Sequence, residues 1–211
     1  MHQTTRFIFR QIIALAALVL ALPVFAQAAY SPVQPPQPTD NPAKIEVIDF
    51  FYYTCPHCKS LSAPLSAWEK KLPDDVYVRK IHVSFGSASI TNLSRLYYAL
   101  EATGDLARLN QEVFKALHEQ RINLAMEGKM LEWLAKQGVN TQKFSDAYKS
   151  FGVESKVRRA DQLSQAYRIQ GVPAIIIDGK YLLEPNSPEK LLALADELIA
   201  KVRAERAAKK K

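Results

Sequence analysis

Two cysteines separated by two residues are the feature of this sequence best suited to chemistry. They lie in the segment Thr54-Cys55-Pro56-His57-Cys58 and are the only cysteines among 211 residues. An apolar run precedes them and a helical pattern follows, which places them at a predicted strand-to-helix junction. A Cys-x-x-Cys pair in this position is typical of a dithiol–disulfide redox site.

The two sulfurs should differ in accessibility. A thiolate attacks a disulfide through a mixed disulfide, so a two-cysteine catalyst needs one accessible sulfur and a second that resolves the intermediate. The apolar residues Leu61, Leu65 and Trp68 continue the helical stripe of Cys58. We therefore expect Cys55 to be exposed at the helix start and Cys58 to be buried beneath it.

The same position predicts the direction of the redox reaction. Free backbone N–H groups and the positive end of the helix dipole should lower the pKa of Cys55. His57 can add positive charge when protonated and a hydrogen-bond donor when neutral, and Pro56 suits a first helical turn. Because a stabilised thiolate favours the reduced form, the disulfide should be oxidising and should be donated to substrates.

Three other interpretations of the cysteine pair fit less well. A structural zinc site needs a second closely spaced ligand pair, and His82 and His118 lie in different predicted elements. A disulfide across two residues closes too small a loop to stabilise a fold. Two unreactive buried thiols do not suit the start of a helix. We therefore expect neither a metal nor another cofactor.

Asp49 and Lys80 could tune the thiols. Asp49 lies inside the apolar strand that leads to Cys55, where a buried carboxyl is costly unless paired and could act on proton transfer at Cys58. An acid at the strand end that reaches solvent is equally compatible with the pattern. Lys80, in the next predicted strand, is a possible partner, although a lysine facing solvent fits the pattern better.

Val172-Pro173 precedes a short apolar strand and could face a bound peptide. An X-Pro bond at a strand start can be cis and can leave the preceding backbone groups free for a ligand chain. Most X-Pro bonds are trans, so the spacing alone does not decide between the two forms.

The chain predicts a mixed sheet with helices on its faces. A short edge strand near 30–33 precedes a central strand at 44–53 and another strand at 76–83. A hairpin at 174–183, with Asp178-Gly179 as its turn, completes the sheet. The parallel start followed by an antiparallel hairpin defines the α/β class.

The segment from Ile90 to Gln170 is helical throughout and predicts an inserted helical subdomain. Asp105 and Thr141 are expected to cap two of its helices. Phe144, Ala147 and Phe151 should form the apolar stripe of the helix that Thr141 begins. After the hairpin, Ser187-Pro188-Glu189 has the residue order of a helix start, with an amphipathic helix following.

The first 28 residues predict export. They contain Arg6 and Arg10, no acid, an apolar stretch at 12–22 and the small-residue cleavage signature Ala26-Gln27-Ala28. A membrane anchor is the alternative, but the apolar stretch is too short to span a bilayer. Cleavage near Ala28 would release the chain into an oxidising compartment, where a disulfide persists.

The net charge of +7 is concentrated at the ends of the chain. Arg6 and Arg10 supply two positive charges and residues 201–211 supply a net five, so residues 29–200 sum to zero. A basic tail is typical of a solvated helix end, so nucleic-acid binding is not expected.

Four segments of the sequence together resemble one known family. They are Phe50 to Cys58, Lys80-Ile81-His82-Val83, Arg168 to Ala174 and the hairpin Asp178-Gly179-Lys180-Tyr181. In these segments, and over nearly all of the chain after the signal peptide, the sequence resembles the DsbA family of periplasmic thiol:disulfide oxidoreductases.

The resemblance implies a thioredoxin fold interrupted by a helical domain. We expect a signal peptide at 1–28, thioredoxin-fold parts at 29–88 and 161–211, and the helical domain at 89–160. It also implies a cis Val172-Pro173 bond beside the active site, with an acid and a lysine under the cysteines at Asp49 and Lys80. The best-known members carry glutamate where this chain has Asp49, whose shorter side chain reaches less far.

The resemblance also implies the protein's partners. Substrates would be reduced, unfolded secreted proteins, and re-oxidation would come from a DsbB-like membrane quinone reductase in the periplasm. The protein itself would be a monomer that contacts the membrane only through that partner. A disulfide reductase or isomerase, or a peptide-binding chaperone without redox activity, remain alternatives.

Overall fold

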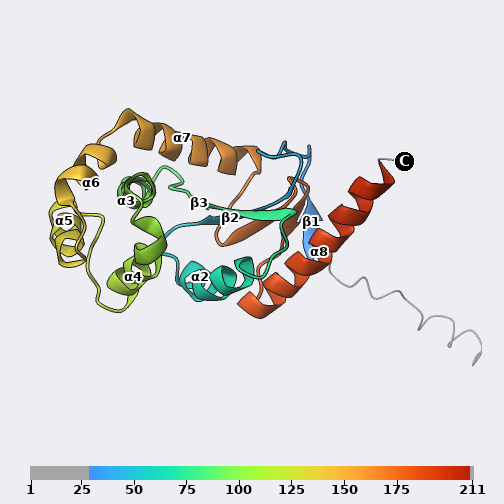
Figure 1. The fold of residues 1–211 in the computed structure, drawn as a ribbon, viewed down its shortest axis with the longest axis horizontal. Coiled ribbons are helices and arrows are strands. Elements are labelled where there is room, and N and C mark those ends of the chain that lie inside the picture. The colour runs from blue at the N-terminus through green and yellow to red at the C-terminus, as the bar shows by residue number, and fades with distance from the viewer. Residues whose placement is uncertain (1–28, 210–211) are drawn as a thin grey trace, which may run out of the picture.

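The protein contains a five-stranded mixed sheet flanked by helices (Figure 1). The computed structural model describes residues 29–209. The strands run in the order β1-β5-β4-β2-β3. They are β1 (Tyr30–Pro32), β2 (Ile45–Phe51), β3 (Val76–His82), β4 (Ala174–Ile177) and β5 (Tyr181–Leu183).

In the described residues, helices lie between and after these strands, and five of them lie between β3 and β4. The described helices are α2 (Pro56–Glu69), α3 (Ala88–Thr103), α4 (Leu106–His118), α5 (Glu127–Lys136), α6 (Thr141–Tyr148), α7 (Phe151–Ala166) and α8 (Pro188–Ala208). The predicted α/β class with a helical insertion is confirmed. The predicted domain limits stay a prediction.

Strand β2 is the centre of the sheet and carries the chain to the cysteines. It pairs parallel with β3 and antiparallel with β4, and all seven of its residues are buried. The predicted hairpin is also present, with φ of 53° at Asp178 and 66° at Gly179. A Cβ at Gly179 would lie 2.1 Å from the Gln37 carbonyl oxygen, so only glycine fits there.

Each face of the sheet is covered by helices (Figure 1). On one face, Val47 and Ile177 belong to a buried cluster with Leu65 of α2 and Leu198 of α8. On the opposite face, the sheet shares a larger buried cluster with α3 and α7, and this cluster continues into the helices between β3 and β4. The start of α2 therefore lies where the sheet meets the helical segment.

Two local predictions in the helical segment are wrong. The cap of α6 is Asn140, whose side chain accepts the Lys143 N–H, and Thr141 is the first helical residue. Phe151 begins α7 and is 80% exposed, because Ser150 caps a new helix there and ends the stripe of α6. Asp105 lies at the cap position of α4 but makes no capping hydrogen bond.

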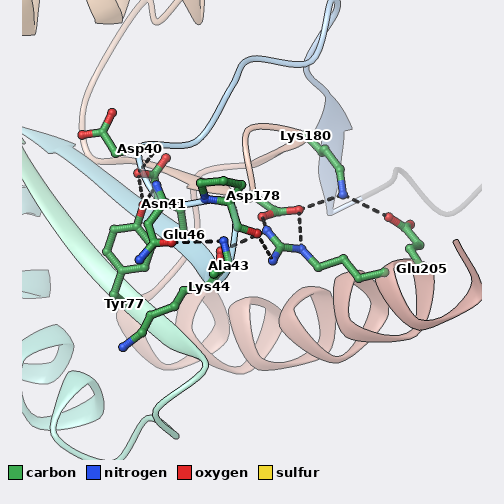
Figure 2. Close-up of polar contacts among 11 residues, drawn as sticks. Asp40, Asn41, Ala43, Lys44, Glu46, Tyr77, Asp178, Lys180 and Glu205 are labelled. Atoms are coloured by element: carbon green, nitrogen blue, oxygen red, sulfur yellow. Dashed lines mark hydrogen bonds and ion pairs between the residues drawn. The ribbon is translucent and has the colours of Figure 1, made fainter. Parts of the chain in front are cut away.

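A polar network joins α8 to the end of the sheet opposite the cysteines (Figure 2). The buried carboxylate of Asp178 pairs with Arg206 of α8 and with Lys180. Arg206 also donates hydrogen bonds to the carbonyl oxygens of Pro42 and Lys44. One arginine thus ties the last helix to the β1–β2 connection and to the hairpin.

The predicted signal peptide lies outside the described residues. Among residues 29–209, no helix has the length and apolar character needed to cross a bilayer.

Candidate active site

Cys55 is the N-cap residue of α2. Its φ and ψ of −81° and 119° are extended, and its sulfur accepts the Cys58 N–H at 3.2 Å. Pro56 occupies the first turn, where its missing N–H costs nothing. The backbone therefore aims a free N–H of the helix start at the Cys55 sulfur, as the sequence predicted.

The expected difference in exposure is wrong. Cys55 is 4% exposed and Cys58 is 3% exposed, so both thiols are buried. The reason is the 168–173 loop before β4: the Cys55 thiol donates to the carbonyl oxygen of Val172, 117 residues later in the chain, at 3.4 Å. Pro56 and His57 remain exposed beside it.

The two thiols nevertheless differ strongly in acidity. A hydrogen bond from the Cys58 thiol is the largest cause that lowers the pKa of Cys55 to about 6; the Cys58 and His57 backbone N–H groups and the His57 charge follow. Burial and the same thiol–thiol hydrogen bond raise the pKa of Cys58. Sequence reasoning credited the helix start and His57 but missed the contribution of Cys58, which the two-residue spacing brings within reach.

A cavity of about 720 Å³ opens next to this pair. Among the residues that line it are His57, Gln170, Val172, Pro173 and Leu182. The Val172-Pro173 peptide bond is cis, as the resemblance implied. The predicted substrate-facing residues are therefore beside Cys55, on one wall of a largely apolar groove.

Asp49 lies under the cysteines on β2. It is 6% exposed, and its Oδ1 has no hydrogen-bond partner. Burial raises the pKa of Asp49 to about 7, with Lys80 opposing the shift and Cys55 adding to it. The alternative in which this acid reaches solvent is wrong.

Lys80 lies beside Asp49 but does not form an ion pair with it. The two residues are register partners in the parallel β2–β3 pair. The Lys80 Nζ instead contacts the Glu69 Oε2 at 2.5 Å, at the last residue of α2. Glu69 was missed from sequence because only the packing of α2 on the sheet brings it to Lys80. The consequence is a buried carboxyl with a cation nearby and no direct partner.

Three further residues around the cysteines were not recognised from sequence. Tyr53 is fully buried, and its backbone contacts His82 and His118, to which the sequence analysis assigned no role at the redox site. Within the described part of the chain, no three His, Cys, Asp or Glu side chains are grouped to hold a metal ion.

Known proteins match most of this chain in sequence and fold. A model of the DSBA-like thioredoxin domain matches residues 46–195. The thiol:disulfide interchange protein DsbA of Bordetella parapertussis is 38% identical over 214 residues, covering 96% of this chain and 100% of the relative. DsbA of Pseudomonas aeruginosa is 37% identical over 185 residues, covering 86% of each chain.

Solved structures give the same result. The crystal structure of Pseudomonas aeruginosa DsbA superposes with a TM-score of 0.80 at 34% identity, covering 87% of this chain and 95% of that one. The oxidoreductase NmDsbA1 from Neisseria meningitidis gives a TM-score of 0.76 at 32% identity, covering 85% and 94%.

The fold and the cysteine pair define the class of the protein, which is a thiol:disulfide oxidoreductase with a thioredoxin fold. Within that class, the extent and identity of the matches decide the family. The chain belongs to the DsbA family.

Proposed function

We propose that this oxidoreductase donates its Cys55–Cys58 disulfide to reduced, folding secreted proteins. The observation that carries the proposal is the Cys55 sulfur at the N-cap of α2, where it accepts the Cys58 N–H. This arrangement stabilises a thiolate on Cys55 and hence the reduced protein. A protein that is more stable when reduced is an oxidant in its disulfide form.

The proposed reaction moves two electrons from substrate to protein. A substrate thiolate attacks the Cys55 sulfur, a mixed disulfide forms, and Cys58 leaves and takes up a proton. A second substrate thiolate then attacks the substrate sulfur of the mixed disulfide, which forms the substrate disulfide and releases Cys55 as a thiolate. The low pKa of Cys55 makes it a good leaving group in this second step.

Asp49 is proposed to exchange a proton with Cys58. Cys58 leaves as a thiolate, and its raised pKa means that it must be protonated promptly. The pKa of Asp49, about 7, lets it give or take a proton near neutral pH, and its Oδ1 is unpartnered. Lys80, held by Glu69, tunes this acid from a distance rather than through an ion pair.

Substrate chains are proposed to lie against Val172-Pro173 and the neighbouring apolar groove. Contacts to backbone and to apolar side chains suit unfolded chains of many sequences. His57 borders both the groove and Cys55, so it would meet the substrate as well as tune the thiol.

We further propose a location, a re-oxidising partner and a domain division for this protein. We place the protein in the periplasm after cleavage near Ala28 and propose that it acts as a monomer. A DsbB-like membrane quinone reductase would re-oxidise the dithiol. The helical domain at 89–160 would divide the thioredoxin fold into parts 29–88 and 161–211.

The test is disulfide transfer to a reduced model protein, followed by titration against glutathione. The oxidised protein should form substrate disulfides stoichiometrically, and Cys55→Ser should abolish the transfer. A redox equilibrium near that of thioredoxin, about −270 mV, would favour a reductase instead. Unchanged substrate oxidation with Cys55→Ser would leave only a peptide-binding chaperone.

A further inference from the structure

The turn that leads into Cys55 is held at its central residues. The Cys55 N–H donates to the Tyr52 carbonyl oxygen at 3.2 Å, which closes a four-residue turn with Tyr53 and Thr54 at its centre. Cys55 then caps α2. The orientations of the two peptide units that flank Tyr53 therefore decide where the Cys55 sulfur lies relative to the Cys58 N–H.

Two histidines from different parts of the fold fix these peptide units. The Tyr53 N–H donates to His82 Nε2 at 3.1 Å, and the Tyr53 carbonyl oxygen lies 2.7 Å from His118 Nε2. A carbonyl oxygen can only accept, so His118 Nε2 carries the hydrogen and donates it. His82 ends β3 and His118 ends α4, so the turn is held from the sheet and from the helical segment.

The His82 contact does not depend on protonation near neutral pH. His82 is fully buried, and burial lowers its pKa to about 3, so the ring stays neutral. Its Nδ1 bonds to the Ser94 hydroxyl at 2.7 Å, which leaves Nε2 free to accept from Tyr53. His118, by contrast, is only partly buried and reaches the turn from the last residue of its helix.

We propose that His118 is a positioning residue of the redox site: from the end of α4 it holds the Tyr53–Thr54 peptide unit and thereby the geometry in which the Cys55 sulfur accepts the Cys58 N–H. This inference rests on the proposed function of Cys55 as the disulfide-donating sulfur. It assigns the helical segment a direct part in setting the redox properties of the thiol pair.

Other contacts from α4 support this role. Asn110 accepts a hydrogen bond from the Tyr53 hydroxyl at 2.8 Å, so one helix holds both the backbone and the side chain of Tyr53. Gln111 donates to Ser62 of α2 at 2.8 Å. Without His118, the Tyr53 carbonyl would lose its donor, and the peptide unit could rotate toward water. The hydrogen bond from the Cys58 N–H to the Cys55 sulfur would then weaken, and the thiolate form of Cys55 would be less stabilised.

Two substitutions of His118 by amide residues test whether the position of its hydrogen-bond donor matters, or only its polarity. In His118→Gln the side-chain N–H₂ falls near the position of Nε2, whereas in His118→Asn it falls near Nδ1 and cannot reach the carbonyl. Both variants are neutral and polar. Phe144→Leu, a buried change in α6 away from the site, is the control for lost stability.

The readouts are the pKa of Cys55, from thiolate absorbance, and the equilibrium constant with glutathione. His118→Asn should raise the pKa and make the protein about threefold to tenfold less oxidising, the range that one net hydrogen bond supplies. His118→Gln should retain most of the wild-type values, and Phe144→Leu should lower stability without changing either readout.

The outcomes distinguish this inference from the proposed function. Wild-type values for His118→Asn, or equal losses in the Gln and Asn variants, would overturn the positioning role. A wild-type Cys55 that titrates like a free thiol would instead contradict the proposed function itself.

Discussion

At the start of α2, Cys55 holds the position where a serine or aspartate oxygen usually accepts the free N–H groups of a helix. A sulfur there accepts the same hydrogen bond best as a thiolate. The interactions that lower the pKa of Cys55 therefore also stabilise the dithiol form relative to the disulfide. The same interactions therefore set both the pKa of Cys55 and the oxidising strength of the disulfide.

Asp49 should make stability depend on pH. Its pKa is raised from 3.8 to about 7, so below pH 4 it is protonated in both the folded and the unfolded chain. As the pH rises from about 4 to 7, the unfolded chain releases the proton and the folded chain retains it, which destabilises the fold by up to about 4 kcal/mol. Asp49→Asn should remove this loss.

Urea denaturation of the reduced protein between pH 4 and 8 checks this. The stability advantage of Asp49→Asn should grow up to about pH 7 and then level off. Asp75→Asn is a useful control because Arg203 lowers the pKa of Asp75 from its usual 3.8, so Asp75 is ionised in both the folded and the unfolded chain over this range and its effect should stay nearly constant with pH. A constant advantage for Asp49→Asn would contradict the buried, raised acid.

At the scale of elements, local chemistry was predictable and tertiary contacts were not. The turn at Asp178-Gly179 was predictable because positive φ demands those residue types. The sequence displays the helix start and His57, which lower the pKa of Cys55, but not its largest cause, the hydrogen bond from the Cys58 thiol. The burial of Cys55 was not predictable either, because the Val172 carbonyl that covers it lies 117 residues away in the chain.

The ion pair between α2 and β3 shows the same limit. Register alone places Lys80 next to Asp49, and that much follows from two adjacent parallel strands. The choice of Glu69 as the partner of Lys80 depends on how α2 lies across the sheet. That packing angle cannot be deduced from a local sequence pattern, so the sequence predicted only that Lys80 lies near Asp49 or faces solvent.

At the scale of the whole molecule, the redox site and the main polar anchor of α8 lie at opposite ends of β2. Arg206 holds the carboxylate of Asp178, whose side chain is only 3% exposed. Stability and redox function should therefore be separable by mutation, because the two groups share no partner.

Arg206→Met tests this separation. Leaving Asp178 without its arginine should lower the free energy of unfolding by about 3 kcal/mol, while the glutathione equilibrium stays unchanged. Arg203→Met removes a similar side chain from the exposed pair with Asp75 and should cost clearly less stability. Equal losses of stability in the two variants would contradict the importance of the buried Asp178–Arg206 pair. A shifted glutathione equilibrium in Arg206→Met would show that this pair and the redox site are not independent.

The central claim is that the Cys58 thiol and the start of α2 together stabilise a thiolate on Cys55. Thiolate absorbance of the reduced protein, followed from pH 3 to 10, measures this directly, and Cys55→Ser identifies the sulfur that titrates. We expect one thiol with a pKa of about 6, which is absent in Cys55→Ser. A Cys55 that titrates near 9, as an ordinary thiol does, would contradict the account.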